Sequence, residues 1–188
     1  WAVGGTLESN WKTLILHWDG ATWTRVTSPN LGSFGNTLSD VTALSANDIW
    51  AVGTANNGGS TLAMRWNGSS WSIVPSPNGS LPGGNTFSFN SVTAVSPNDV
   101  WAVGIQASSS VGGAGQPIYI GYTLIEHWNG TAWSEVPAAS LPSATAEDGQ
   151  LNGVAATGAG DVWAVGSYYE AALSVQASRT LIERFTAP

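Results

Sequence analysis

The chain has no cysteine and little positive charge, and both absences exclude whole classes of protein. Without cysteine, its 188 residues hold no disulfide, no thiol nucleophile and no thiolate metal site. Lys and Arg number 5 against 12 Asp and Glu, and no basic patch exists, so we expect no nucleic-acid partner. No apolar run reaches the roughly 20 residues that a membrane-spanning helix needs, so we expect no insertion into a membrane.

Tryptophan is abundant instead, at 11 residues, and 23 glycines stand among many Ser, Thr and Asn residues. Aromatic and β-branched content this high and this evenly spread is not that of a disordered chain. Short apolar runs between turn-forming residues predict an all-β protein with many short strands. The scarcity of lysine and the absence of cysteine favour an exported protein, so we expect an extracellular or cell-surface location.

One repeat, present in four copies, organises the whole chain. Its most regular block, Trp-Ala-Val-Gly, recurs about every 50 residues or slightly more. A Val-Thr-Ala-Val block precedes it, and blocks similar to Thr-Leu-Ile-Glu-His-Trp and Trp-Ser-Glu-Val follow it. We refer to these blocks, in that order, as strands A, B, C and D. The four copies of strand B begin at Trp1, Trp50, Trp101 and Trp163.

Each block has the pattern of a short strand, because it is rich in β-branched or aromatic residues and bounded by turn residues. Strands C and D are separated by Asp19-Gly20, Asn67-Gly68 or Asn129-Gly130, which favour a tight type I′ hairpin turn with positive φ at both central residues. The unit is therefore a four-stranded antiparallel meander of about 50 residues, the size of a kelch-type propeller blade.

The sequence thus predicts a single all-β domain over residues 1–188, a β-propeller with strand A innermost and strand D outermost. Its blade pieces are 1–30, 38–78, 89–137 and 151–188. The first piece lacks strand A and the last lacks strand D, and both contain B and C, so they cannot merge into one blade. Because the chain also starts abruptly at Trp1, we expect a segment of a larger propeller. The alternative is that open strand edges pair with another chain, a form of self-association.

Ten of the eleven tryptophans occupy repeat positions, and Trp11 is the exception. Fixed spacing of this kind is explained by packing between neighbouring blades, because a buried indole removes a large apolar area from water. We therefore expect these tryptophans to be structural.

Two stretches carry a family resemblance. Asn98–Gly104, followed by Thr123–Trp133, resembles a repeat of exported bacterial β-propeller proteins, and is more loosely similar to kelch and galactose-oxidase-type propellers. Asp19–Trp23 resembles the Asp-box hairpin of sialidase-like propellers, although the Ser that precedes that box is absent. The resemblance covers nearly the whole chain and implies the propeller fold. It implies no catalytic residues, since propellers host many unrelated activities.

The B–C and D–A loops of such a meander lie on one face, and here they are the long and variable ones, which makes this the expected binding face. Tyrosine offers a flat apolar ring and a hydroxyl, which suits contact with sugars or proteins. We therefore expect a protein or glycan ligand on this face. The alternative is that the tyrosines cover exposed blade edges. All four tyrosines fall in the B–C loops 105–122 and 167–179, as Tyr119, Tyr122, Tyr168 and Tyr169.

Strand C carries a basic residue at one position in every copy, and strand alternation places these side chains on one face. They could form a ring that holds an anionic ligand. Each could instead pair with a backbone carbonyl or a local carboxylate, such as Glu126 or Glu183 in a neighbouring blade. We favour local pairing, because strand C does not line the channel. The four candidates are His17, Arg65, His127 and Arg184.

We predict no metal and no cofactor. Two histidines this far apart are a weak metal signal. A single aspartate recurs in the A–B turn, which is far short of the roughly six to eight oxygens that calcium needs. We expect this residue, Asp48, Asp99 or Asp161, to cap its turn instead.

Catalysis is disfavoured by the symmetry of the repeat. The unmatched charged pair is Glu147-Asp148, in a D–A loop, and paired carboxylates hydrolyse glycosides only at a set separation. We therefore predict a non-enzymatic exported or surface scaffold that binds protein or glycan, or assembles with copies of itself. The first alternative is a carbohydrate-binding lectin, and the second is a glycoside-acting hydrolase that uses Glu147 and Asp148.

Overall fold

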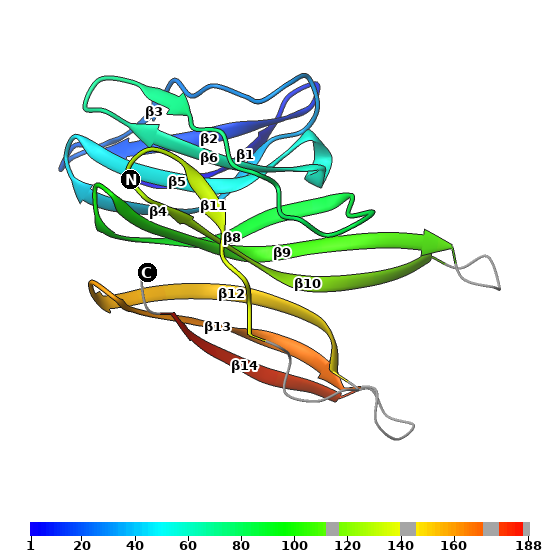
Figure 1. The fold of residues 1–188 in the computed structure, drawn as a ribbon. Helices are drawn as coiled ribbons and strands as arrows, with labels where there is room; N and C mark the ends of the chain where they lie inside the picture. The colour runs from blue at the N-terminus through cyan, green and yellow to red at the C-terminus, as the bar shows by residue number, and fades with distance from the viewer. Residues whose placement is uncertain (112–116, 140–145, 171–176, 186–188) are drawn as a thin grey trace.

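A computed structural model of the chain describes residues 1–111, 117–139, 146–170 and 177–185. These residues form four antiparallel sheets of three or four strands, which confirms the all-β prediction. The sheets are stacked face to face in chain order (Figure 1), and we number them 1 to 4. No helix long and apolar enough to cross a membrane occurs in the described ranges.

The strands follow the repeat blocks closely. Sheet 1 contains β1 (Ala2–Leu7), β2 (Trp11–Trp18) and β3 (Trp23–Val26). Sheet 2 contains β4 (Thr37–Ser45), β5 (Asp48–Ala55), β6 (Ser60–Trp66) and β7 (Trp71–Ile73), with a 3-10 turn at Asn56–Gly58. Sheet 3 contains β8 (Thr86–Ser96), β9 (Asp99–Val111), β10 (Pro117–Trp128) and β11 (Trp133–Glu135). Sheet 4 contains β12 (Ala146–Gly158), β13 (Asp161–Glu170) and β14 (Ala177–Phe185).

The meander order A-B-C-D is complete in sheets 2 and 3, whose strands run β4-β5-β6-β7 and β8-β9-β10-β11. Sheet 1 has strands B, C and D, and sheet 4 has strands A, B and C. The A strands of sheets 2, 3 and 4 follow one another, since β4 contacts β8 and β8 contacts β12, while sheet 1 meets β4 through its B strand, β1. An apolar layer lies between each pair of sheets, so the core is divided into three parts.

Tryptophans join the sheets, as the repeat predicts. Trp50 of strand B in sheet 2 packs on Trp128 and Trp133 of sheet 3, with ring centroids 5.1 and 5.3 Å apart. The B-strand aromatic of one sheet thus covers the C- and D-strand aromatics of the next. The same relation joins Trp1 to Trp66 and Trp71, and Trp101 to Phe185.

The C–D turns differ from the predicted type I′. Glycine has positive φ in each turn, but the preceding Asp or Asn does not, and the loop holds four residues between paired tryptophans. The side chain of Asp19 accepts hydrogen bonds from the amides of Ala21 and Thr22, both at 2.8 Å. Asn67 and Asn129 accept the equivalent bonds. This side-chain turn replaces the two-residue hairpin, because it satisfies two backbone amides at once.

The third and fourth B–C loops are mostly strand rather than loop. Strand β9 continues to Val111 and β10 resumes at Pro117, while β13 runs to Glu170 and β14 starts at Ala177. Figure 1 shows the β9–β10 hairpin projecting beyond sheets 1 and 2, on the side where β13 ends and β14 begins. We call this side of the stack the hairpin side.

Each A strand has a β-bulge, and this bulge allows only glycine at the last position of the Trp-Ala-Val-Gly block that follows it. At the bulge between Phe89 and Ser91, strand β8 approaches β9 so closely that a Cβ on Gly104 would lie 1.9 Å from the backbone oxygen of Ser88. Gly53 and Gly166 meet the same obstacle. Gly4 has nothing within 4 Å, because sheet 1 has no strand A beside it.

The bulges of β8 and β12 also leave a backbone amide outside the ladder, and the preceding sheet satisfies it. The Asp40 carboxylate accepts a hydrogen bond from the amide of Val92 at 2.9 Å, and the Ser91 hydroxyl accepts one from the amide of Val154 at 3.3 Å. The Ser91 hydroxyl in turn donates to Asp40 at 2.7 Å. A polar chain thus links the A strands of sheets 2, 3 and 4.

This bulge geometry predicts opposite effects for one substitution at equivalent repeat positions. Gly104→Ala should destabilise the protein by about 3 kcal/mol or more, because backbone must move to admit the methyl group. Gly4→Ala should change stability by no more than about 0.5 kcal/mol, since its site is open. Urea unfolding of both variants measures the difference, and equal losses in the two proteins would contradict the role assigned to the bulge.

Candidate functional site

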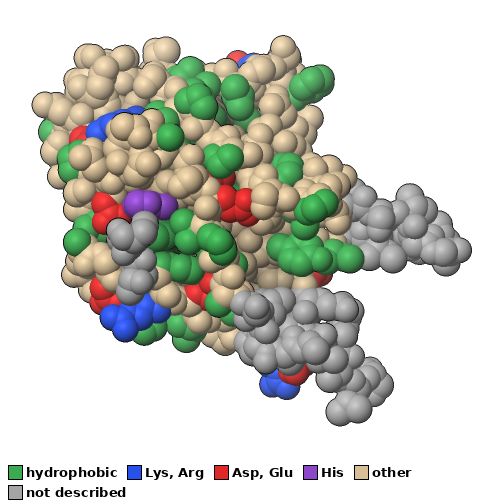
Figure 2. Space-filling view, in the orientation of Figure 1, with side chains coloured by type: hydrophobic (Ala, Val, Ile, Leu, Met, Phe, Trp, Pro, Cys, Tyr) green, Lys and Arg blue, Asp and Glu red, His purple; other side chains and the backbone are tan. Residues whose placement is uncertain are grey.

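The basic residues of strand C are paired within their own sheets. Arg65 forms a bidentate ion pair with Asp48, with both N–O distances at 2.8 Å. Arg184 Nε lies 2.7 Å from Asp161 Oδ1, and His127 Nε2 lies 2.9 Å from Asp99 Oδ1. The partners are therefore the aspartates of the A–B turns, and the suggested partners Glu126 and Glu183 are wrong. Figure 2 shows charged and histidine side chains adjoining one another along the edge opposite the projecting hairpin.

The tryptophan of strand B lies against the basic residue of each of these pairs. The indole N–H of Trp101 donates to Asp99 at 2.7 Å, and its ring lies 4.4 Å from the His127 ring. Trp163 donates to Asp161 in the same way. Arg65 lies over Trp50 and Arg184 over Trp163. Because Arg65, His127 and Arg184 each already have a carboxylate and an aromatic ring beside them, this arrangement closes the A–B turn onto strand C. It favours local pairing over an anion-binding ring.

Hydrogen bonds shift the pKa of two groups in these pairs. Bonds from Thr157 and then Arg184 lower the pKa of Asp161, and the bond to Asp48 raises the pKa of Arg65. In sheet 1, which has no strand A and hence no A–B turn, the ring of His17 instead lies 4.4 Å from the Trp1 ring. Turn capping comes from Ser45 and Ser96, whose hydroxyls accept the amides of the Asn residues two positions later.

The tyrosines are not gathered into one site. Tyr168 is buried in the apolar layer between sheets 3 and 4. Tyr122 and Tyr169 are exposed on different sheets, in β10 and β13. Tyr119 lies in β10 opposite Ser109, and its side chain is outside the described part of the structure. One tyrosine thus belongs to the core, and two remain available for contacts on the hairpin side.

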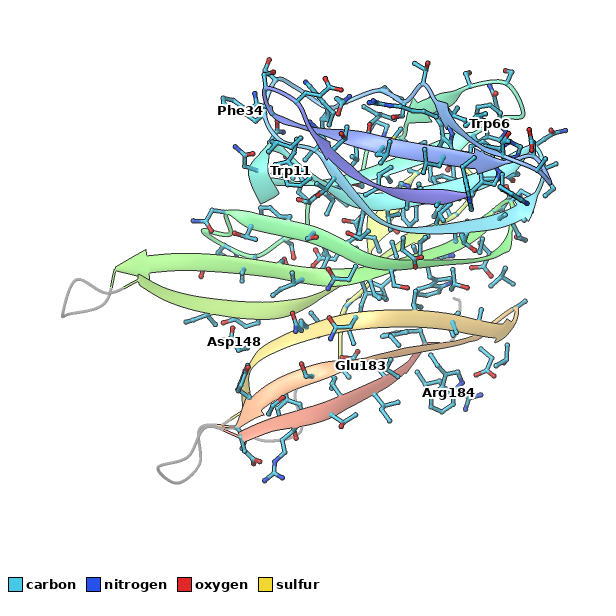
Figure 3. The ribbon with its side chains drawn as sticks, turned by 180° about the vertical axis from the view of Figure 1, so that it is seen from behind. Trp11, Phe34, Trp66, Asp148, Glu183 and Arg184 are labelled. Atoms are coloured by element: carbon cyan, nitrogen blue, oxygen red, sulfur yellow. The ribbon has the colours of Figure 1, made fainter. Side chains whose placement is uncertain are left out.

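A cluster that the sequence analysis missed lies on sheet 1. Leu7 and Trp11 face each other across the β1–β2 ladder, and Phe34 lies in the connection between β3 and β4. Leu7 is 66% exposed, Trp11 46% and Phe34 61%. Figure 3 shows Trp11 and Phe34 on the hairpin side of the stack, the side from which the β9–β10 hairpin projects. We call these three residues the sheet 1 patch. Its signal in the sequence was Trp11, the tryptophan outside the repeat positions.

Hydrogen bonds hold the segment that carries Phe34 in place. The amide of Asn36 donates to the Trp11 carbonyl at 2.9 Å, which fixes the segment against β2. Gly35 and Asn57 exchange two bonds of 3.0 Å, one through the Asn57 side chain, which fixes it to sheet 2. Asn10 adds a bond to the Ser33 carbonyl. The exposed side chains therefore stand on a preorganised support, which lowers the entropic cost of binding.

Two hollows lie along the outer edge of sheets 1 and 2. One of about 400 Å³ is polar, with Lys12, Asn30 and the Glu8–Arg25 ion pair in its wall. The other, of about 430 Å³, has two indoles, Trp66 and Trp71, beside hydroxyl groups. Its hydroxyl-bearing residues are Thr27, Ser28, Ser69 and Ser70. An aromatic wall with neighbouring hydroxyls suits a sugar ring.

The unmatched carboxylates lie in β12 rather than in a loop. Asp148, with φ of 57°, accepts a hydrogen bond from the amide of Gly121 in β10 and so joins sheets 3 and 4. Glu147 pairs with Tyr169 in the β12–β13 ladder, and its side chain is outside the described part. Within that part, no group of three or more His, Asp or Glu residues has the arrangement of a metal site.

A carboxyl group lies buried between sheets 2 and 3. Glu126 is fully buried, and neither of its oxygens has a hydrogen-bond partner among the described residues. Burial, and then the charge of Glu135 opposite it in β11, raise the pKa of Glu126 from 4.5 to about 8. Glu183 occupies the same repeat position, and burial raises its pKa as well. Sheet 2 has Met64 there, and sheet 1 has Leu16.

Comparison with known proteins adds no family to this description. No protein-family model matches the chain, and no curated protein matches its sequence.

The buried carboxyl predicts an unusual dependence of stability on pH. The folded pKa of Glu126 lies above the unfolded one, so the native state keeps a proton that the unfolded chain releases. The wild type therefore loses stability as pH rises from about 4.5 to about 8. Glu126→Met, which copies sheet 2, should raise the free energy of unfolding at pH 7 by on the order of 3 kcal/mol, and by much less at acidic pH.

Urea unfolding across this pH range measures the effect. Glu8→Gln is the control, because it removes an exposed carboxyl group whose surface ion pair with Arg25 should contribute little to stability. If the stability of Glu126→Met ran parallel to that of the wild type across the range, Glu126 would not be the group responsible.

Proposed function

We propose that the chain is a non-catalytic binding scaffold, a β-propeller or part of one, that takes a protein or glycan ligand on its hairpin side. The observation that carries the proposal is the sheet 1 patch, where Leu7, Trp11 and Phe34 are exposed on a hydrogen-bonded support. Exposed aromatic residues on a rigid support are typical of binding surfaces. Ile120, Tyr122 and Tyr169 extend the exposed apolar surface on the same side.

Several features of the stack support the propeller arrangement. The sheets follow each other in chain order, each with the meander of a blade, and the A strands of sheets 2, 3 and 4 follow one another. The polar chain from Asp40 through Ser91 to Val154 runs along these strands. Strand A is thus the inner strand of the proposed blades, and strand D the outer one.

The use of polar residues supports a scaffold rather than a catalyst. The recurrent aspartates bond the Arg or His of strand C in sheets 2, 3 and 4, and Asp148 holds the backbone of β10. The proposed location is extracellular or at the cell surface, supported by the absence of cysteine and the low content of charged residues, 9%.

The second candidate is a carbohydrate-binding lectin, and the groove lined by Trp66 and Trp71 favours it. An indole stacks on the apolar face of a sugar, while neighbouring serine hydroxyls can bond its hydroxyl groups. This groove lies at the outer edge of sheets 1 and 2, so its ligands can be distinguished from those of the sheet 1 patch by mutation.

The ligand is sought on a glycan array and, in parallel, in a phage-displayed peptide library. We expect Trp11→Ala and Phe34→Ala each to weaken binding of the selected ligand at least about tenfold, because each removes an exposed aromatic contact. Trp23→Ala is the matched control, because it removes an exposed indole from a different surface. Circular dichroism and thermal unfolding verify that all three variants remain folded.

The same binding measurement separates the candidates. Ser70→Trp fills the groove beside Trp66 and Trp71 without touching the sheet 1 patch. If Ser70→Trp lost binding of a sugar that Trp11→Ala still bound, the result would favour the lectin. It would overturn the assignment of the ligand site to the sheet 1 patch. A ligand bound equally well by the Trp11→Ala, Phe34→Ala double variant would also overturn it.

A further inference from the structure

The two end faces of the stack expose large apolar side chains that have buried counterparts inside it. On sheet 4, Trp163 is 41% exposed, Val165 47% and Ile182 59%. On sheet 1, Trp18 is 44% exposed and Trp23 51%. These five residues lie apart from the sheet 1 patch, and the repeat gives each of them equivalents in the other sheets.

The exposed face of sheet 4 is the face that other sheets turn toward the next sheet. Trp50 and Trp101 are the equivalents of Trp163, and they are 0% and 1% exposed. The equivalents of Val165 and Ile182 are exposed to the same small extent, at 0% for Val52 and Val103 and 1% for Ala63 and Ile125. Sheet 4 therefore carries the inserting half of the sheet-to-sheet junction with its apolar side chains exposed.

The exposed face of sheet 1 carries the opposite half. Trp18 and Trp23 correspond to Trp128 and Trp133 of sheet 3, which lie under Trp50 at 7% and 6% exposure. Trp18 and Trp23 lie against each other in sheet 1, with ring centroids 5.5 Å apart, as Trp128 and Trp133 do at 6.1 Å. The receiving pair is therefore already assembled.

We propose that sheet 4 of one copy of the chain docks on sheet 1 of a second copy, with Trp163 against Trp18 and Trp23. The contact repeats the junction that the chain makes three times within itself, so its shape and chemistry are those of the internal layers. It is a head-to-tail contact between two different surfaces, so two copies can close into a ring through both ends, or further copies can extend the stack.

Polar groups at the two faces fit this contact. Arg184 is held by Asp161, as Arg65 is held by Asp48 beside the internal junction, so this arginine enters the contact with its charge paired. On sheet 1 the position of the buried Glu126 is taken by Leu16, so this junction buries no carboxyl group.

The inner edge fits as well. Gly153 stands in sheet 4 where Asp40 and Ser91 accept an amide from the next sheet. Sheet 1 has no strand A, and so presents no such amide to accept. Sheet 4 therefore has no side-chain acceptor at Gly153, and sheet 1 has no strand A amide that would need one.

This contact is separate from the proposed ligand surface and from pairing at strand edges. Sheet 4 and sheet 1 meet through side chains on their faces, while the sheet 1 patch lies at the hairpin side. Loss of ligand binding on Trp11→Ala therefore says nothing about assembly, and loss of assembly says nothing about the ligand.

The test uses two single variants that each disable one face. Ile182→Lys places a charge on the inserting face, and Trp23→Lys places one on the receiving face; both positions are exposed, so both proteins should fold. We expect the wild type to assemble with increasing concentration in light scattering and sedimentation velocity, and each variant alone to be monomeric. An equimolar mixture should form a one-to-one dimer, because each variant retains the face that the other lacks.

A matched control distinguishes this contact from general stickiness. Tyr122→Lys removes an exposed aromatic residue on the hairpin side and should assemble like the wild type. A wild type that stays monomeric at about 0.1 mM would overturn the proposal and leave further repeats as the occupants of these faces. Variants that assemble alone, or that fail to associate when mixed, would overturn it too.

Discussion

The stack depends on the contact between the strand B tryptophan of one sheet and the aromatic pair of the next. Burying one indole removes on the order of 200 Å² from water, an upper estimate of about 5 kcal/mol at 25 cal/mol per Å². The indole N–H of Trp50 has no hydrogen-bond partner among the described residues, so this contact is held by apolar packing. A single sheet could not bury these surfaces alone, which makes each sheet dependent on its neighbour.

The turn aspartates explain why equivalent tryptophans differ in their hydrogen bonds. Asp48 bonds the guanidinium fork of Arg65 through both oxygens, and the indole of Trp50 donates to neither of them. Asp99 is bonded by a single nitrogen of His127, and the indole N–H of Trp101 donates to the same carboxylate oxygen. Arg184 bonds Asp161 through Nε alone, and there the indole of Trp163 also donates to the aspartate. The bidentate fork of Arg65, rather than the choice of Arg or His, therefore distinguishes the packed indole of Trp50 from the bonded ones.

Much of the fold was predictable because strand patterns and turn residues act locally. Period, strand order and packing of the tryptophans all follow from the spacing of the blocks. The C–D turn was assigned the wrong type, because the side-chain bonds of Asp19 compete with a two-residue hairpin. The partners of Arg184 and His127 were also wrong, because they depend on which residues the ladder brings opposite each other. The sheet 1 patch was missed because Phe34 is brought beside Leu7 and Trp11 by the long-range hydrogen bonds of Gly35 and Asn36.

The repeat itself shows where function can reside. A residue present in every copy is already engaged with its neighbours, as the aspartate–cation pairs and the bulge glycines show. Surfaces free for other partners therefore arise where the repeat is broken or has no next sheet. Trp11 is outside the repeat, while Trp163 and Trp23 are within it but uncovered. An exposed residue outside the repeat, such as Trp11, fits a ligand of different chemistry. An uncovered repeat residue, such as Trp163 or Trp23, fits another sheet of the same kind.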